Sequence, residues 1–151
     1  AMQARVQQDL AEIAGGRHSV SFAEAAEPVM GGEFLGCGAL AGPPDTPYEG
    51  GVFEVTVRFP KGYPIEPPRV NFATRVFHCN ISPDGLVGLA MLSNGWMPST
   101  TLSQVLSAVS ELLAHPDPAD ALVPEIAVLY RQDRRRHDAM ARRCTEQYAM
   151  A

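Results

Sequence analysis

Cysteine is scarce in this chain of 151 residues, and long apolar runs are missing from it. The three cysteines stand far apart, at Cys37, Cys79 and Cys144. That spacing fits neither a disulfide framework nor a Cys-x-x-Cys metal site, and it favours a reducing compartment such as the cytoplasm or nucleus. The four histidines are equally scattered, so we expect no metal and no other cofactor. Because no apolar stretch approaches the roughly 20 residues of a membrane helix, we expect no membrane partner either.

An excess of positive charge is also missing. The formal net charge is -5, whereas a nucleic-acid partner requires clustered Lys and Arg that displace counterions from phosphates. We therefore expect no nucleic-acid partner. The start of the chain shows no basic patch followed by an apolar core and a cleavage site, so secretion is not indicated. One basic cluster lies near the other end, and we expect it to be a solvated helix face with ion pairs at helical spacing: Arg131, Arg134, Arg135, Arg136, Arg142 and Arg143.

Length and composition describe one globular domain. The apolar share of 46% and the charged share of 19% are ordinary for such a protein. A chain of this length fits a single domain that buries most of its apolar surface, so we assign residues 1–151 to one domain.

Helical periodicity appears at both ends of the chain. Apolar residues recur every three or four positions in four segments, which we expect to be amphipathic helices: residues 3–14, 101–114, 124–130 and 133–148. In the first of these, Asp9 falls on the polar face. Thr101 and Gln104 form a capping-box pair at the start of the second. The last helix is expected to present one side made of His137, Met140, Ala141, Cys144 and Tyr148.

Alternating apolar and polar residues predict strands in the first half. The alternation is clearest at 52–59, and shorter strands are expected at 34–40 and 69–72. Residues 74–99 keep neither period and predict an extended loop, which in a compact domain is often functional. Helix, strands, irregular loop and further helices together indicate an α+β domain with an antiparallel sheet.

Several longer strings go beyond periodicity. They are residues 42–53 (GPPDTPYEGGVF), 59–68 (FPKGYPIEPP), 78–81 (HCNI), 96–98 (WMP) and 122–127 (LVPEIA). In this order, and over nearly the whole chain, they closely resemble the ubiquitin-conjugating (E2) family. The resemblance implies an N-terminal helix, a four-stranded antiparallel meander, an active-site loop and C-terminal helices. It also makes the Tyr63-Pro64 bond a candidate cis peptide.

The resemblance implies a reactive cysteine that this chain lacks. E2 chemistry needs a thiol that accepts ubiquitin as a thioester and passes it to an amine. In the family that cysteine follows a His-Pro-Asn motif at a fixed interval. Counting the same interval from His78-Cys79-Asn80 leads to Gly88, which has no side chain to react. The flanking residues keep the family register: Leu89, Leu92 and Trp96.

Two remnants of the family site surround this gap. Asn80 matches an asparagine that stabilises the oxyanion formed on the thioester. Without an intermediate, we expect it to hold the loop by side-chain to backbone hydrogen bonds. Asp120 matches an acidic residue that orients or deprotonates the incoming lysine, and here we favour a structural role as a turn or cap residue. His78 completes the remnant site.

Cys79 is the rival nucleophile, since it lies inside the motif. A thiol at that position would be displaced relative to Asn80, and a misplacement of about 1 Å can cost two orders of magnitude in rate. A free cysteine is more often a small buried apolar residue. A cysteine in the middle of this tripeptide also resembles the photomorphogenesis-repressing E2 variants of plants, which likewise lack the catalytic cysteine.

Partner surfaces follow from the same resemblance. Active E2s carry Lys or Arg on the first helix for the activating enzyme, whereas this helix has only Arg5 as a basic residue, which should weaken such docking. The ligase-facing positions correspond to Ile65 and to Met97-Pro98. An apolar Ile65 can anchor a partner. The alternative is that Ile65 and Met97 only pack the loops.

These observations predict a non-catalytic E2 variant that modulates ubiquitin transfer by binding an E2, ubiquitin or an E3 ligase complex. The first alternative is an unconventional active E2 that forms a thioester on Cys79. The second is a structural subunit that keeps the fold as a rigid interaction block, because a fold does not determine function.

Overall fold

The computed structural model describes residues 2–14, 20–22 and 26–150. An antiparallel sheet lies at its centre, with strand order β1-β3-β4-β5, and β2 also pairs with β3. The strands are β1 (Val20–Phe22), β2 (Glu27–Pro28), β3 (Phe34–Ala41), β4 (Val52–Phe59) and β5 (Arg69–Phe72). Both β1 and β2 pair with β3, at opposite ends of that strand, so the first position of the four-stranded sheet is filled by two short pieces. The α+β class and the antiparallel sheet are confirmed.

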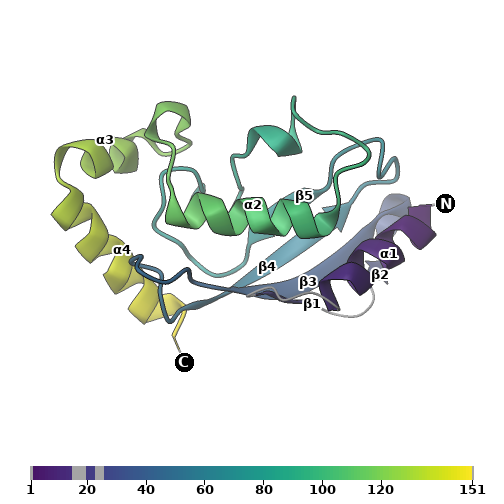
Figure 1. Cartoon of the computed structure of the whole chain (residues 1–151), viewed down its shortest axis with the longest axis horizontal. Coiled ribbons are helices and arrows are strands. Elements are labelled where there is room, and N and C mark those ends of the chain that lie inside the picture. The colour runs from purple at the N-terminus through teal and green to yellow at the C-terminus, as the bar shows by residue number, and fades with distance from the viewer. Residues whose placement is uncertain (1, 15–19, 23–25, 151) are drawn as a thin grey trace.

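Helices cover one face and both ends of this sheet (Figure 1). They are α1 (Met2–Ala14), α2 (Leu102–Ala114), α3 (Pro124–Gln132) and α4 (Arg134–Tyr148). Helix α2 crosses the sheet, α1 lies at one end of the molecule, and α3 and α4 lie at the other. Within the described part of the chain, no helix combines the length and the apolar character needed to cross a membrane.

The core forms where α2 meets β4. Phe53, Val55, Val57 and Phe59 are buried while the residues between them are not, as the strict alternation of β4 predicts. The opposite side of this core is the apolar stripe of α2, whose buried members include Val105, Leu106, Val109 and Leu113. Fully burying a residue of this size contributes about 1.5–3 kcal/mol. The interface of β4 with α2 is therefore the main apolar contact of the domain.

The start of α2 carries the expected capping box. The Thr101 hydroxyl accepts from the Gln104 backbone N–H at 3.2 Å, and the Gln104 side chain accepts from the Thr101 N–H at 2.9 Å. Such a pair satisfies two backbone donors that have no partner inside the helix. It fixes the position at which the irregular segment ends and the helix begins.

Helix α1 is confirmed, but the polar placement of Asp9 is wrong. Asp9 is only 1% exposed. The Tyr63 hydroxyl donates to its carboxylate, and the Arg5 Nε lies 3.1 Å from the same oxygen. Because a buried carboxylate is stable only with such partners, Asp9 joins α1 to the segment that follows β4. That segment contains the cis Tyr63-Pro64 bond, as expected.

The predicted side of α4 is partly wrong. The buried residues are His137, Ala141 and Thr145, which recur at every fourth position, whereas Met140 and Tyr148 are exposed. Only the residues at this spacing are fully buried against the body, because a helix buries a stripe narrower than the set of its apolar residues. The ion pairs expected at helical spacing are present for Arg134 with Asp138 and for Arg142 with Glu146.

Residues 74–99 form the irregular loop that the sequence predicts, with one short 3-10 turn at Ala90–Leu92. An isolated bridge between Asn71 and Leu86 holds the loop against the edge of β5, and a second bridge, between Ile81 and Val87, closes the loop on itself. Gly85 makes this approach possible. Its φ is +90°, and a Cβ there would lie 2.1 Å from the Phe72 carbonyl oxygen. The loop thus brings residues 78–88 beside the sheet.

Candidate functional site around Gly88

The His78 ring anchors the site to α2. His78 is fully buried, its Nδ1 accepts from the Asn80 backbone N–H at 3.0 Å, and its Nε2 lies 2.7 Å from the Leu112 carbonyl oxygen. Since a carbonyl only accepts, the ring proton is on Nε2. Burial lowers the pKa of His78 to about 4. The ring is therefore a neutral bridge between the loop and the helix.

The Asn80 amide joins the loop to the segment after α2. Its Nδ2 donates to the carbonyl oxygens of Asp117 and Asp120 at 2.9 and 3.1 Å, and its Oδ1 accepts from the Asp117 N–H at 2.8 Å. These are the side-chain to backbone bonds expected of Asn80. Both amide protons are used, so the donor that the family uses on an oxyanion is occupied here.

Asp120 lies near this junction, in the short 3-10 helix Pro118–Asp120, but does not cap that helix. The residue that caps the short helix Pro118–Asp120 is Asp117, whose side chain accepts from the Ala119 N–H at 3.2 Å. Asp120 is the last residue of this turn, so it is a turn residue, one of the two structural roles expected of it, and not a cap residue. Asp120 lines a groove on the surface, and its backbone carbonyl is held by Asn80.

Gly88 lies on the wall of that groove, which has a volume of about 500 Å³. Its N–H donates to the Asn80 carbonyl oxygen at 2.9 Å. A Cβ at this position would lie 3.0 Å from two side-chain carbons of Leu122 and 3.3 Å from the Asn80 oxygen. The exposed side chain of Leu122 thus lies in tight contact with position 88 and would have to shift slightly to admit a side chain there.

Cys79 faces away from the groove. The residue is fully buried, and its Sγ lies 3.4 Å from the Asn80 Oδ1. Its carbonyl oxygen accepts from the N–H groups of Leu122 and Val123 at 2.8 and 3.0 Å. Burial raises the pKa of the Cys79 thiol, which disfavours the reactive thiolate. Among the described residues that line the groove, none is a cysteine.

The predicted ligase-facing residues are exposed. Ile65 is 73% exposed and Met97 is 60% exposed, and Pro98 is exposed beside it. The interpretation that these residues only pack the loops is therefore wrong. The two loops are nevertheless tied together, because the Trp96 indole N–H donates to the Pro64 carbonyl oxygen at 2.9 Å. We call Ile65, Met97 and Pro98 the apolar loop surface.

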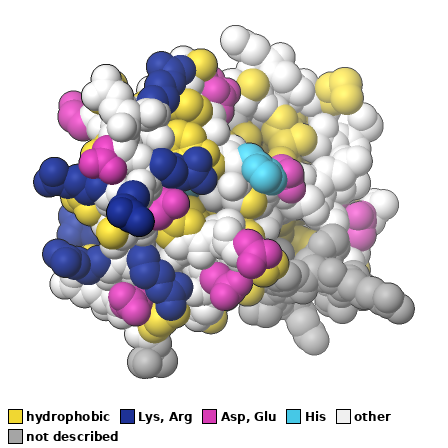
Figure 2. All heavy atoms as spheres, turned by 60° about the vertical axis from the view of Figure 1, so that its left-hand side comes forward, with side chains coloured by type: hydrophobic (Ala, Val, Ile, Leu, Met, Phe, Trp, Pro, Cys, Tyr) yellow, Lys and Arg dark blue, Asp and Glu magenta, His cyan; other side chains and the backbone are white. Residues whose placement is uncertain are grey.

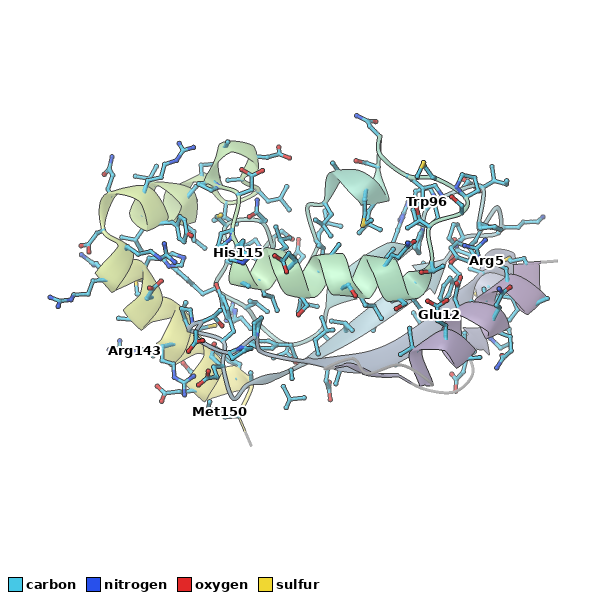
Figure 3. All side chains as sticks on the ribbon, in the orientation of Figure 1. Arg5, Glu12, Trp96, His115, Arg143 and Met150 are labelled. Atoms are coloured by element: carbon cyan, nitrogen blue, oxygen red, sulfur yellow. The ribbon has the colours of Figure 1, made fainter. Side chains whose placement is uncertain are left out.

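Arg5 lies at the same end of the molecule as Trp96 (Figure 3). Its guanidinium pairs with Asp9, donates to the Thr100 carbonyl oxygen at 2.8 Å and lies 5.7 Å from the centre of the Tyr63 ring. The one basic side chain of α1 is thus engaged within the domain. Contact of Arg5 with a partner stays a prediction.

The sequence did not point to three contributors to this site. Leu122 closes the space beside Gly88, Asp117 receives the Asn80 amide, and Asp9 supports the Tyr63 segment. Only Leu122 belongs to one of the family strings, and nothing in the string indicates its contact with residue 88. Within the described residues, no three His, Cys, Asp or Glu side chains gather closely enough for a metal ion.

A comparison with protein families agrees with this architecture. The family model for the ubiquitin-conjugating enzyme matches residues 33–145, which is most of the chain. The match includes the sheet from β3 onward, the loop with Gly88 and helices α2 and α3.

The buried, neutral His78 predicts loss of stability in acid. The unfolded chain takes up a proton below a pKa of about 6.5, whereas the folded chain does so only near 4, so stability is complete above the first value and falls as pH drops towards the second. His78→Gln keeps the donor to Leu112 but cannot titrate. Between about pH 7 and about pH 5, the parent should lose about 2 kcal/mol more than this variant in urea unfolding.

The control for this measurement is His115→Gln, because His115 is 75% exposed. This variant keeps His78, so its loss of stability between about pH 7 and about pH 5 should match that of the parent. If the unfolding free energies of the parent and of His78→Gln changed equally with pH, that result would contradict the burial of a neutral ring at position 78.

Proposed function

Since this chain belongs to the ubiquitin-conjugating enzyme family and has a role in ubiquitin conjugation through its E2 domain, we propose that it acts there without carrying ubiquitin itself. It is a non-catalytic E2 variant that modulates ubiquitin transfer by binding an active E2, ubiquitin or an E3 ligase complex. The observation that carries this proposal is Gly88, which stands where the family has its nucleophile.

The geometry around Gly88 supports the absence of a nucleophile rather than its relocation to another residue such as Cys79. A thioester needs a sulfur atom at the groove, and glycine supplies no atom that can react. The Leu122 side chain lies 3.0 Å from the position that a Cβ of residue 88 would take. The Asn80 amide is occupied by the backbone of Asp117 and Asp120. The neighbours of Gly88 are thus arranged for packing.

The alternative of an active E2 charged on Cys79 has weaker support. The thiol is buried, its pKa is raised, and the Cys79 carbonyl oxygen is held by two N–H groups. Turning the sulfur into the groove would break those hydrogen bonds and expose the core side of the loop. Each buried hydrogen bond lost in this way costs about 1–3 kcal/mol.

The charge of helix α1 also supports the absence of ubiquitin loading. Active members of the family present basic side chains on this helix to the activating enzyme, and charge complementarity speeds such encounters. The basic side chain that α1 does have, Arg5, is bound to Asp9 and to the Thr100 carbonyl oxygen. Loading by the activating enzyme is therefore disfavoured at the docking step as well as at the chemical step.

The apolar loop surface supports a binding role. Ile65, Met97 and Pro98 are exposed on two loops that the Trp96 indole holds together. A rigid, exposed apolar surface loses little conformational entropy when a partner covers it. We assign this surface to a ligase or to another protein of the ubiquitin pathway.

A charging reaction tests the absence of catalysis. With activating enzyme, ATP and ubiquitin, the chain should form no adduct that reductant removes, because no thiol faces the groove. An active E2 in the same reaction provides the positive control. An adduct that forms with the parent and with Cys37→Ser, but disappears in Cys79→Ser, would establish the alternative.

Substitution of Ile65 tests the binding role. Calorimetric titrations with ubiquitin, an active E2 and a RING ligase domain should find a partner whose Kd rises at least about tenfold in Ile65→Asp, since a charge is then placed in the apolar contact. Val128→Asp is the matched control, because Val128 is exposed to a similar degree but lies on α3. Absence of binding to all three proteins would instead favour the rigid interaction block.

A further inference from the structure

Positive charge is concentrated at the end of the molecule farthest from the apolar loop surface. Residues 124–150 contain six of the twelve basic residues of the chain but only four of its seventeen acidic ones. In Figure 2, Lys and Arg side chains gather on the side of the molecule that carries α3 and α4, with hydrophobic and acidic side chains among them. An acidic chain thus carries a local basic surface.

A shallow hollow lies within this surface. It is lined by Arg136, Ala139, Met140 and Arg143 of α4 and has a volume of about 310 Å³. Arg136, Met140 and Arg143 recur at the spacing that places residues on one side of a helix. Met140 is 42% exposed and lies between the two arginines. We call these four residues the α4 surface.

The two arginines of the α4 surface have no partner within the described residues. Asp138 and Glu146 of the same helix pair with Arg134 and Arg142 instead. The guanidinium groups of Arg136 and Arg143 make neither a hydrogen bond nor an ion pair with the rest of the described chain. Solvated ion pairs, which the sequence predicted for the whole cluster, therefore account for only part of it.

The α4 surface is presented on a fixed support. The opposite side of α4 packs into the body through His137, Ala141 and Thr145. The C-terminal end of the helix is also tied to the sheet, because the Val52 N–H donates to the Ala149 carbonyl oxygen at 3.0 Å. A partner meets arginines whose spacing is set by the helix, and this reduces the entropy lost on binding.

From these observations we propose that the α4 surface docks an extended acidic segment of a partner protein. Its carboxylates bind Arg136 and Arg143 as bidentate pairs, and an apolar side chain between them contacts Met140 over Ala139. The two arginines are seven positions apart, which is about 10 Å along the helix axis. An extended chain in the polyproline II conformation advances about 3.1 Å per residue with three residues per turn. Two acidic residues three positions apart then lie on the same side, about 9 Å from each other, and with an apolar residue between them they fit the surface.

Met140 and the charge of the remaining chain favour a peptide over a nucleic acid. A phosphate backbone has no apolar group to place on an exposed methionine between two arginines. Residues 1–123 contain thirteen acidic and six basic residues, so a long polyanion that extends beyond the surface is repelled. A short acidic segment avoids this repulsion. Binding at the α4 surface does not depend on Gly88 or on the apolar loop surface.

A fluorescent peptide tests the inference directly. The probe contains two Glu residues three positions apart around a Leu, and its binding to the full chain is followed by anisotropy at about 0.15 M salt, where distant charges are screened. Arg136→Ala combined with Arg143→Ala should weaken binding at least about tenfold. Met140→Ser should weaken it less, and a peptide with Gln in place of both Glu should not bind.

The matched control combines Arg134→Ala with Arg142→Ala. It removes two arginines from the same helix, with the same change in net charge, and keeps the four residues of the α4 surface, although Arg142 also donates to the Glu49 carbonyl oxygen. Its Kd should stay within about twofold of the parent, and circular dichroism shows that each variant keeps its helices. An equal loss in both double variants, no detectable binding by the parent, or tighter binding of a single-stranded oligonucleotide would each overturn the proposal.

Discussion

The hydrogen bonds of His78 and Asn80 hold together the parts of this domain that bear on its function. Through His78 the irregular loop is fixed to α2, and through Asn80 it is fixed to the segment between α2 and α3. The wall of the groove follows from these contacts, because they bring Gly88 and Leu122 together although the two residues are distant in sequence. The site is therefore a rigid junction of three segments.

That junction explains how this E2 domain keeps its architecture with glycine at position 88. The contacts of His78 and Asn80 stabilise the fold whether or not a sulfur atom is present. They involve no side chain at position 88, and Leu122 lies beside that position. The apolar loop surface and the α4 surface lie at opposite ends of the molecule and differ in chemistry.

Much of the fold could be predicted from the sequence because it depends on local patterns. The alternation in β4 and the capping box of α2 lie within a few residues of one another, and both were predicted at the correct positions. Asp9 was misplaced because its partner Tyr63 lies 54 residues away. The exposed position of Met140 was missed because periodicity shows which residues are apolar but not how wide the buried stripe is.

The sequence predicted which residues belong to the site but not which residues they contact. The family strings led to Gly88 and Asn80, but the acceptors of the Asn80 amide lie 37 and 40 residues further along the chain. For the same reason, nothing in the sequence showed that Leu122 meets position 88. The burial of Cys79 depends on the whole junction, so the sequence could not predict it.

The central claim is that position 88 faces the groove and that the remaining thiol of the motif does not. Maleimide labelling followed by intact mass measurement tests it in a chain with Cys37→Ser and Cys144→Ser. In the native state Cys79 should react about 100-fold more slowly than after denaturation, since local opening must precede reaction, and adding Gly88→Cys should introduce a site that reacts at once. Labelling of native Cys79 as fast as that of the cysteine introduced at position 88 would contradict the account.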